Sequence, residues 1–255
     1  MNFVFDIDGT ICFDGENIDQ RIVDTINEAK EYGHRVVLAS ARSYRDVLPI
    51  IRDKFHPDYV VGLNGSMVNK NGTLQMFKDI TKELFDTLSS FCIKNNMPFF
   101  VDDLFDYHSF KSEKIPFFPF VDQLKIANSI ELKKVNFPLK MVINVKDHQT
   151  TVDELQDIVD SKIAETMYHE GEKLFYVNPK GVNKATTLKA LFDEYLCFGN
   201  DKNDIEMFKN AIYSVQVGDY EGLKDYADLQ ISDGENNIEK ICETIKELYE
   251  KYSLK

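Results

Sequence analysis

The stretch NFVFDIDGT, residues 2–10, decides the fold. An apolar run here passes directly into two aspartates and a glycine. A short apolar run that ends in acidic and small residues is typical of a buried strand in an open α/β sheet, where ligands bind beyond the carboxyl ends of the strands. Side chains two positions apart lie on the same face of a strand, so we expect Asp6 and Asp8 to converge on one point.

The following segments alternate between helical patterns and apolar runs. A helical pattern over 19–32 precedes the run RVVLAS at 35–40, and a second helical pattern over 44–55 precedes YVVGLN at 59–64. Strands that are buried on both faces appear as continuous apolar runs, and strands separated by helices are joined in parallel. The sequence therefore predicts an α/β fold with a doubly wound parallel sheet.

The pattern changes between residues 81 and 183. A helical stretch over 81–95 precedes PFFVDD, an aromatic and proline-rich region and the strand-like run KMVINV. A helical pattern over 151–164 then precedes two strand-like runs, ETMYHEG and KLFYVNP, with no helix between them. Strands that follow one another in pairs favour an antiparallel sheet. We therefore predict an inserted α+β domain at 81–183, which interrupts a sheet domain made of 1–80 and 184–255.

The first pattern returns after residue 184. Helical patterns over 185–195, 204–210 and 237–252 alternate with the strand-like runs LCFGND, SVQVGD and DLQIS. This return indicates that the end of the chain completes the sheet domain that its beginning opens.

Composition and charge exclude several classes of partner. The chain has 43 acidic and 30 basic residues and a formal net charge of −13, which repels a nucleic-acid backbone. Its apolar runs are far shorter than the roughly 20 residues that span a bilayer. We therefore expect neither nucleic acid nor membrane as a partner. Four scattered cysteines without a C-x-x-C pair, and a beginning without a charged-then-apolar leader, predict a reducing, cytoplasmic location.

The aspartate pair is the strongest chemical signal. Two carboxylates held close together repel each other, and a divalent cation is the usual means of neutralising them. Gly9 lets the backbone turn, and Thr10 offers a hydroxyl and an N–H group to an anion. The same residues also fit a plain turn with an aspartate cap, so DIDGT taken alone leaves both interpretations open.

Together with its position, FDIDGT resembles the first motif of the haloacid dehalogenase superfamily, and nearly the whole chain is similar to the Cof-type sugar-phosphatase branch. The resemblance implies a Rossmann-like core with an inserted cap domain at 81–183. In the family motif the first aspartate is the nucleophile and the second is the general acid and base. The resemblance therefore implies these roles for Asp6 and Asp8.

Three further segments carry the resemblance. Ser40, which ends RVVLAS, resembles the second-motif hydroxyl that binds the transferring phosphoryl group; Arg42 fits the family pattern, whereas Ala41 replaces its usual glycine. Lys184, in GVNKATTL, resembles the third-motif lysine that neutralises phosphate and nucleophile. The asparagine-glycine pair that closes YVVGLN resembles a pair common at the mouth of Cof-type sites. The resemblance thus implies a phosphate site at Thr10, Ser40, Ala41, Lys184 and Asn203, and a substrate mouth at Arg42, Asn64 and Gly65.

The fourth motif departs from the family form. The segment GNDKND at 199–204 stands where the family usually has G-D-x-x-N-D, so the first acidic position is occupied by Asn200. Two arrangements remain open. Either the amide oxygen of Asn200 ligates magnesium, since hard cations accept amide oxygens, or Asp201 turns in with support from Asp204. The resemblance implies a Mg²⁺ site drawn from Asp6, Asp8, Asn200, Asp201 and Asp204.

The implied function is a magnesium-dependent phosphatase for small phosphate monoesters, such as sugar phosphates or similar metabolites, acting through an aspartyl-phosphate intermediate. One alternative is a phosphomutase or phosphotransferase of the same superfamily, which would pass the phosphoryl group to a second sugar. Another is a phospho-accepting regulatory module without turnover. The presence of Asp8, an acid that serves hydrolysis, argues against the regulatory module.

Overall fold

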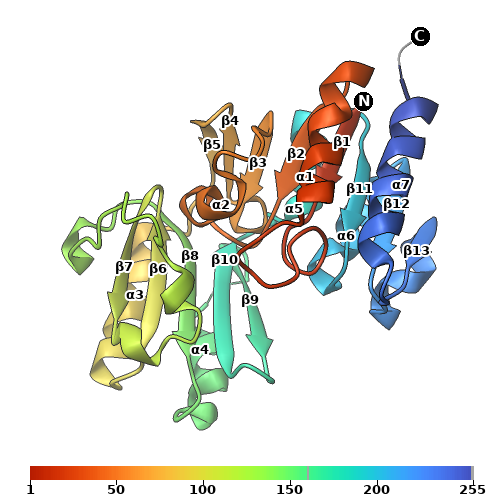
Figure 1. Cartoon of the computed structure of the whole chain (residues 1–255). Helices are drawn as coiled ribbons and strands as arrows, with labels where there is room; N and C mark the ends of the chain where they lie inside the picture. Colours follow the sequence, from red (N-terminus) through yellow and green to blue (C-terminus); the bar gives the residue numbers. More distant parts are fainter. Residues whose placement is uncertain (160, 254–255) are drawn as a thin grey trace. The chain divides into compact units, whose positions relative to one another are not determined.

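The chain forms two compact units, whose elements are traced in Figure 1. The computed structural model describes residues 1–159 and 161–253. Unit 1 consists of Met1–Arg42, Val47–Gln75 and Asn183–Lys255, and unit 2 consists of Ser43–Asp46 and Met76–Val182. Within the described part of the chain, no helix combines the length and the apolar character needed to cross a membrane.

Unit 1 is built on an eight-stranded sheet with the order β13-β12-β11-β1-β2-β3-β4-β5. The pairs from β13 to β3 are parallel, and β4 runs antiparallel to β3. The strands are β1 (Asn2–Phe5), β2 (Arg35–Ala39), β3 (Tyr59–Gly62), β4 (Met67–Lys70), β5 (Thr73–Phe77), β11 (Leu196–Gly199), β12 (Tyr213–Val217) and β13 (Leu229–Ile231).

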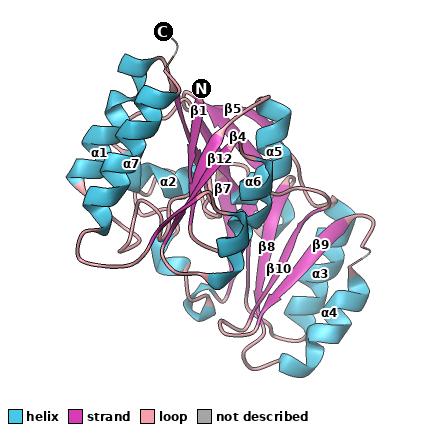
Figure 2. Cartoon of the chain, turned by 90° about the vertical axis from the view of Figure 1, so that its right-hand side faces the viewer, coloured by secondary structure: helices cyan, strands magenta, loops and turns pink. Residues whose placement is uncertain are grey.

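Helices cover both faces of this sheet, as Figure 2 shows. On β1, Phe3 packs against the ring of Tyr249 on one face, and Val4 joins a buried cluster with Leu188 and Met207 on the other. The predicted doubly wound α/β fold is therefore confirmed. The helices of unit 1 are α1 (Gln20–Asn27) and α7 (Asn237–Lys251) on the first face, and α5 (Lys184–Leu191) and α6 (Ile205–Asn210) on the second. A further helix, α2 (Tyr44–Ile51), follows β2.

The central strand β1 lies where the direction of winding reverses. It pairs in parallel with β11 on one side and with β2 on the other. Parallel neighbours end at the same edge of a sheet, and ligands bind at such a switch point. Asp6, Ser40 and Asn200 follow directly after β1, β2 and β11, so the topology brings these three positions to one edge.

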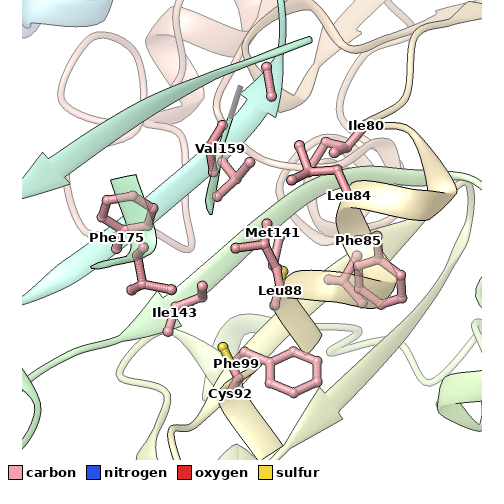
Figure 3. Packing of buried hydrophobic residues seen from close by; sticks show 14 of the residues in the cluster. Ile80, Leu84, Phe85, Leu88, Cys92, Phe99, Met141, Ile143, Val159 and Phe175 are labelled. Atoms are coloured by element: carbon pink, nitrogen blue, oxygen red, sulfur yellow. The ribbon is translucent and has the colours of Figure 1, made fainter. Parts of the chain in front are cut away.

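Unit 2 contains an antiparallel sheet with the order β7-β6-β8-β10-β9. Helix α3 (Lys82–Lys94) begins at the N-cap Thr81, whose side chain accepts the N–H of Leu84. Figure 3 shows Leu88 of α3 packed in the buried cluster with Met141 and Phe99. The predicted α+β fold of the insert is therefore confirmed. Its other elements are β6 (Phe99–Asp103), β7 (Asp106–Phe110), β8 (Pro138–Asn144), α4 (Val152–Ile158), β9 (Ala164–His169) and β10 (Leu174–Pro179).

Several elements differ from the sequence prediction. The helix predicted over 151–164 ends at Ile158, because Val159 has an extended backbone and β9 already begins at Ala164. The helix predicted over 185–195 ends at Leu191, because Phe192 also has an extended backbone. The hairpin of β4 and β5 was not predicted, since β5 is exposed along its whole length and its sequence lacks a continuous apolar run.

Candidate active site

Asp6 and Asp8 lie in different environments at the end of β1. The strand ends at Phe5, and the following loop turns at Gly9, which has φ 79° and donates its N–H to the carbonyl of Cys12. Asp6 is buried, whereas the side chain of Asp8 is 46% exposed. The prediction that both carboxylates share one face of a strand is therefore wrong, because the strand stops before them.

Lys184 binds the carboxylate of Asp6 at the start of α5. Its ammonium donates to Asp6 Oδ1 at 2.5 Å and to Asp204 Oδ1 at 2.7 Å, and all three side chains are buried. Asn183 caps the helix through a reciprocal pair of hydrogen bonds with Thr186, which fixes the position of Lys184 as the first helical residue. One cation thus bridges two buried carboxylates.

The charges of this group shift one another's pKa. Burial raises the pKa of Asp6 to about 7, although the neighbouring Lys184 ammonium opposes the shift. Burial lowers the pKa of Lys184, but the carboxylates of Asp204 and Asp6 outweigh that effect and hold it above its usual value. Lys184 is therefore a permanent positive charge beside Asp6.

Thr10 and Asn200 bring further oxygen atoms to Asp6. The hydroxyl of Thr10 lies 3.1 Å from Asp6 Oδ2 and 3.3 Å from Asn200 Oδ1. The side chain of Asn200 stands over Gly9, where an added Cβ atom would lie 2.1 Å from Asn200 Nδ2. Close approach of Asn200 to this loop therefore requires glycine at position 9.

Asp204 and Asp201 are occupied by contacts with their own segment. Asp204 Oδ2 accepts the N–H groups of Asn200 at 2.9 Å and Asp201 at 3.2 Å, while its other oxygen accepts from Lys184. The exposed carboxylate of Asp201 accepts the N–H of Lys202 at 2.6 Å and caps the short helix Lys202–Asp204. Of the three predicted candidates in this segment, Asn200 is the one whose side chain reaches the Asp6 loop.

Arg42 pairs with Asp8, a contact that the sequence did not predict. Its Nε and Nη2 atoms donate to the two carboxylate oxygens at 2.9 and 2.6 Å, and Nη2 also donates to the carbonyl of Gly15. The buried hydroxyl of Ser40 accepts the N–H of Arg42 at 3.1 Å, so Ala41 lies within a tight turn. The segment Ser40–Arg42 is thereby connected to the aspartate loop.

The predicted substrate-mouth pair, Asn64 and Gly65, lies beside two other predicted residues. Asn64 donates its N–H to the carbonyl of Ser40 at 2.9 Å, and its side-chain oxygen accepts from Asn203 Nδ2 at 3.3 Å. Gly65 has φ 108°, and an added Cβ would lie 2.5 Å from the carbonyl of Asn183. The carbonyl of Gly65 also accepts from Thr187, so this turn packs directly on the start of α5.

Two further contacts support the segment from Gly199 to Asp204. Asp201 and Asp204 form a reciprocal capping box, in which each side chain accepts a backbone N–H of the other residue. Gly199 leaves the space for this arrangement, since an added Cβ would lie 2.7 Å from Asp204 Cγ. The capping pattern shows why Asp201 and Asp204 are engaged with backbone N–H groups.

The donor atoms suit a hard cation. Among the described residues, no three His, Cys, Asp or Glu side chains come together as a metal-binding group. The oxygens that converge on the Thr10 hydroxyl come instead from one carboxylate, Asp6, and one amide, Asn200. Mg²⁺ binds carboxylate and carbonyl oxygens and commonly retains several waters, so few protein ligands suffice. The residues at this edge of the sheet therefore fit magnesium.

Comparison with known proteins identifies the family of the chain. Residues 3–248 match the model of the haloacid dehalogenase-like hydrolase family. The 5-amino-6-(5-phospho-D-ribitylamino)uracil phosphatase YitU of Bacillus subtilis is 23% identical over 235 residues, which cover 84% of each chain. Two solved structures share the fold. A subclass IIB sugar phosphatase of the superfamily has 18% identity and a TM-score of 0.72, and a haloacid dehalogenase-like hydrolase from Bacteroides thetaiotaomicron has 21% identity and a TM-score of 0.77. Each comparison covers 97% of this chain and 98% of the other.

The family match extends over nearly the whole chain and confirms the resemblance to the Cof-type branch of the superfamily. The chain belongs to the haloacid dehalogenase-like hydrolase family and is an enzyme of its phosphatase type.

Proposed function

We propose that this enzyme is a magnesium-dependent phosphatase that hydrolyses small phosphate monoesters, such as sugar phosphates, with Asp6 as its nucleophile. The observation that carries the proposal is the buried carboxylate of Asp6, held between the Lys184 ammonium at 2.5 Å and the Thr10 hydroxyl at 3.1 Å. These contacts orient a carboxylate at the sheet edge where such folds bind ligands. A fixed, oriented nucleophile lowers the entropic part of the barrier.

In the first step a carboxylate oxygen of Asp6 attacks phosphorus, which forms an aspartyl-phosphate and breaks the ester bond. The leaving alcohol takes a proton from Asp8, which lies two residues after Asp6 in the same loop. For this step the partly exposed carboxyl group of Asp8 turns away from Arg42. In the second step Asp8 takes a proton from water. The resulting hydroxide attacks phosphorus, releases inorganic phosphate and restores the Asp6 carboxylate, so two easier steps replace one difficult step.

Fixed positive charge and hydrogen-bond donors stabilise the transferring phosphoryl group. Lys184 supplies the charge beside the nucleophile, and the buried hydroxyl of Ser40 supplies a donor at the neighbouring strand end. Asn203, which contacts Asn64, supplies an amide group on the same side as the substrate mouth. Preorganised groups of this kind account for most of the catalysis of phosphoryl transfer.

Magnesium would be held by the Asp6 carboxylate, the main-chain carbonyl of Asp8 and the Asn200 amide oxygen. When bound, the ion supplies positive charge that offsets the repulsion between the carboxylate and an incoming phosphate. Asn200 is preferred to Asp201 because its oxygen lies at the Asp6 loop, whereas the carboxylate of Asp201 caps its own helix. Asp204 supports the site by binding Lys184 and the backbone of Asn200.

The insert at 81–183 serves as a cap that selects the substrate, while residues 1–80 and 184–255 supply the chemistry. The support is the separate antiparallel sheet and core of unit 2. Among its aromatic residues, Phe99 and Phe100 are buried, whereas Tyr107 and Phe117 are partly exposed. Tyr107 and Phe117 are therefore better suited than Phe99 and Phe100 to contact a substrate.

The test is a turnover assay with an aryl phosphate and a panel of phosphorylated sugars, polyols and pyridoxal phosphate, with and without magnesium. The panel includes the phosphorylated ribitylamino compound on which the Bacillus subtilis relative is named to act. Magnesium-dependent release of inorganic phosphate supports the proposal, and an added sugar acceptor measures any transfer. Absence of turnover with every member of the panel would contradict it.

A further inference from the structure

Helix α2 is divided between the two units. The helix runs from Tyr44 to Ile51, but its first turn, with the preceding Ser43, belongs to unit 2, whereas Val47 and the residues after it belong to unit 1. Two of the points at which the chain passes between the units therefore flank Ser43–Asp46. The segment Ser43–Asp46 begins directly after Ser40–Arg42, which the proposed function expects to bind the phosphoryl group.

Arg45 fixes the first turn of α2 within unit 2. Its side chain is fully buried and pairs with Asp102 of β6 at 2.8 Å. It also donates to the main-chain carbonyls of Phe105 at 3.0 Å and Asp106 at 3.2 Å. The guanidinium carbon lies 5.0 Å from the centre of the Tyr107 ring. A single side chain thus contacts both strands of the β6–β7 hairpin.

Asp46 adds a second set of contacts to the same turn. Its carboxylate binds Arg45 through both oxygens at 2.9 and 2.8 Å, and it accepts the N–H of Asp122 at 2.8 Å. Ser43 donates its hydroxyl to Asp46 and accepts the N–H of Asp46. Burial lowers the pKa of Arg45, but the two carboxylates outweigh this and raise it above its usual value. A buried charge without its partners is strongly destabilising, so this turn stays with unit 2.

Pro49 weakens α2 next to this turn. In an α-helix the N–H of residue 49 would bond to the carbonyl of Arg45, but proline has no N–H group, and its ring crowds that carbonyl. The helix therefore lacks one of the bonds that would join its first turn to its remainder. The change of unit between Asp46 and Val47 falls within the span of this missing bond.

We propose that Arg45 is a positioning residue, which holds the first turn of α2 on the β6–β7 hairpin and thereby sets the position of the adjoining Ser40–Arg42 segment. The Arg42–Ser43 peptide bond then transmits a displacement of the first turn of α2 to the Ser40–Arg42 segment, while Pro49 weakens the connection of that turn to the rest of the helix. The effect on phosphate rests on the proposed function, whereas the coupling itself does not. Displacement of groups around a transferring phosphoryl group by about 1 Å reduces the rate about 100-fold, so a modest shift has a measurable effect.

The test compares the wild-type protein with Arg45→Met and Asp102→Asn, and with Leu88→Ala as the matched control. Leu88 is buried in the core of unit 2, in a different cluster from the Arg45 network, so its loss destabilises unit 2 without touching α2. Amide hydrogen exchange is measured at residues 40–47, and inhibition of aryl phosphate hydrolysis by inorganic phosphate is measured at a temperature where every variant is folded.

The inference predicts faster exchange at residues 40–42 in Arg45→Met and Asp102→Asn, and a phosphate inhibition constant about tenfold higher. Leu88→Ala should lower the melting temperature but leave both readings near wild type. If Arg45→Met does not fold, Asp102→Asn decides, because it keeps the side-chain size. Unchanged exchange, or an equal change in Leu88→Ala, would overturn the inference. If the wild-type protein hydrolyses no phosphate ester, the proposed function fails, while the exchange measurement still tests the coupling.

Discussion

Lys184 Nζ lies 2.5 Å from Asp6 Oδ1 and 2.7 Å from Asp204 Oδ1, so one buried ammonium neutralises two buried carboxylates. Asp204 in turn binds the backbone N–H groups of Asn200 and Asp201. The position of the expected nucleophile and the conformation of the expected metal-binding segment are therefore connected through one lysine.

Replacing Lys184 with methionine should destabilise the protein as well as abolish its activity. Loss of one partner of a buried ion pair costs about 3–5 kcal/mol, because the remaining charges are left uncompensated. Denaturant unfolding measures the change. The matched control is Lys82→Met, which removes an exposed ion pair with Asp86 and should change stability little. Equal stability of Lys184→Met and wild type would show that Asp6 and Asp204 are not held as described.

Asn200, rather than Asp201, should determine the magnesium requirement. We expect Asn200→Ala to raise the magnesium concentration for half-maximal activity by about tenfold or more, because a ligand is lost. Asp201→Ala should have a small effect, since that carboxylate caps the short helix at Lys202–Asp204. Magnesium titrations of the two variants decide the matter. A larger effect of Asp201→Ala would indicate that this side chain turns in to bind the ion.

Gly9→Ala should disrupt the site beyond the cost of backbone strain. Gly9 and Gly33 both have positive φ, 79° and 74°, but an added Cβ meets Asn200 Nδ2 at 2.1 Å only in the first case, and nothing within 4 Å in the second. Gly33→Ala therefore reports the strain alone, about 1 kcal/mol. We expect Gly9→Ala to lose activity and magnesium affinity, while Gly33→Ala loses some stability only. Similar kinetics of the two variants would contradict the placement of Asn200.

His34 should make the stability of unit 1 depend on pH. Burial lowers the pKa of His34 below 6.5, although its hydrogen bond to the carbonyl of Tyr249 opposes the shift. The unfolded chain then binds a proton more readily than the folded protein, so stability present above pH 6.5 is lost as the pH falls below that value. Melting temperatures between pH 7.5 and 5 of wild type and His34→Gln, with the exposed His169→Gln as control, test this. An equally steep decline in His34→Gln would assign the effect to other groups.

The sheet and the positions of the expected catalytic residues follow from the sequence, because buried parallel strands leave continuous apolar runs that end at one edge. Asp6 was located in this way, at a strand end, whereas Ser40 and Lys184 were assigned through the resemblance to the family motifs. The directions in which the side chains point beyond the strand ends could not be predicted from the sequence. They depend on contacts between distant segments, such as the pairing of Arg42 with Asp8.

The sequence could not decide whether Asn200 or Asp201 ligates magnesium, because that choice also depends on contacts formed only in the folded chain. It depends on the backbone N–H groups that Asp204 accepts, and these are set by the turn after β11. The network of Arg45 was likewise hidden, since a single arginine in a first helical turn resembles any solvated residue. Only tertiary packing brings it to Asp102, fifty-seven positions along the chain.

The most direct measurement of the central claim is mass spectrometry of the Asp8→Asn variant after acid quenching during incubation with an aryl phosphate and magnesium. Without the Asp8 carboxyl group, hydrolysis of the intermediate should be slowed more than its formation. The account predicts a phosphoryl group on the peptide that contains Asp6, and none on the same peptide of the Asp6→Asn, Asp8→Asn double variant. Full turnover by Asp6→Asn, or a phosphoryl group on any other residue, would contradict the assignment of Asp6 as the nucleophile.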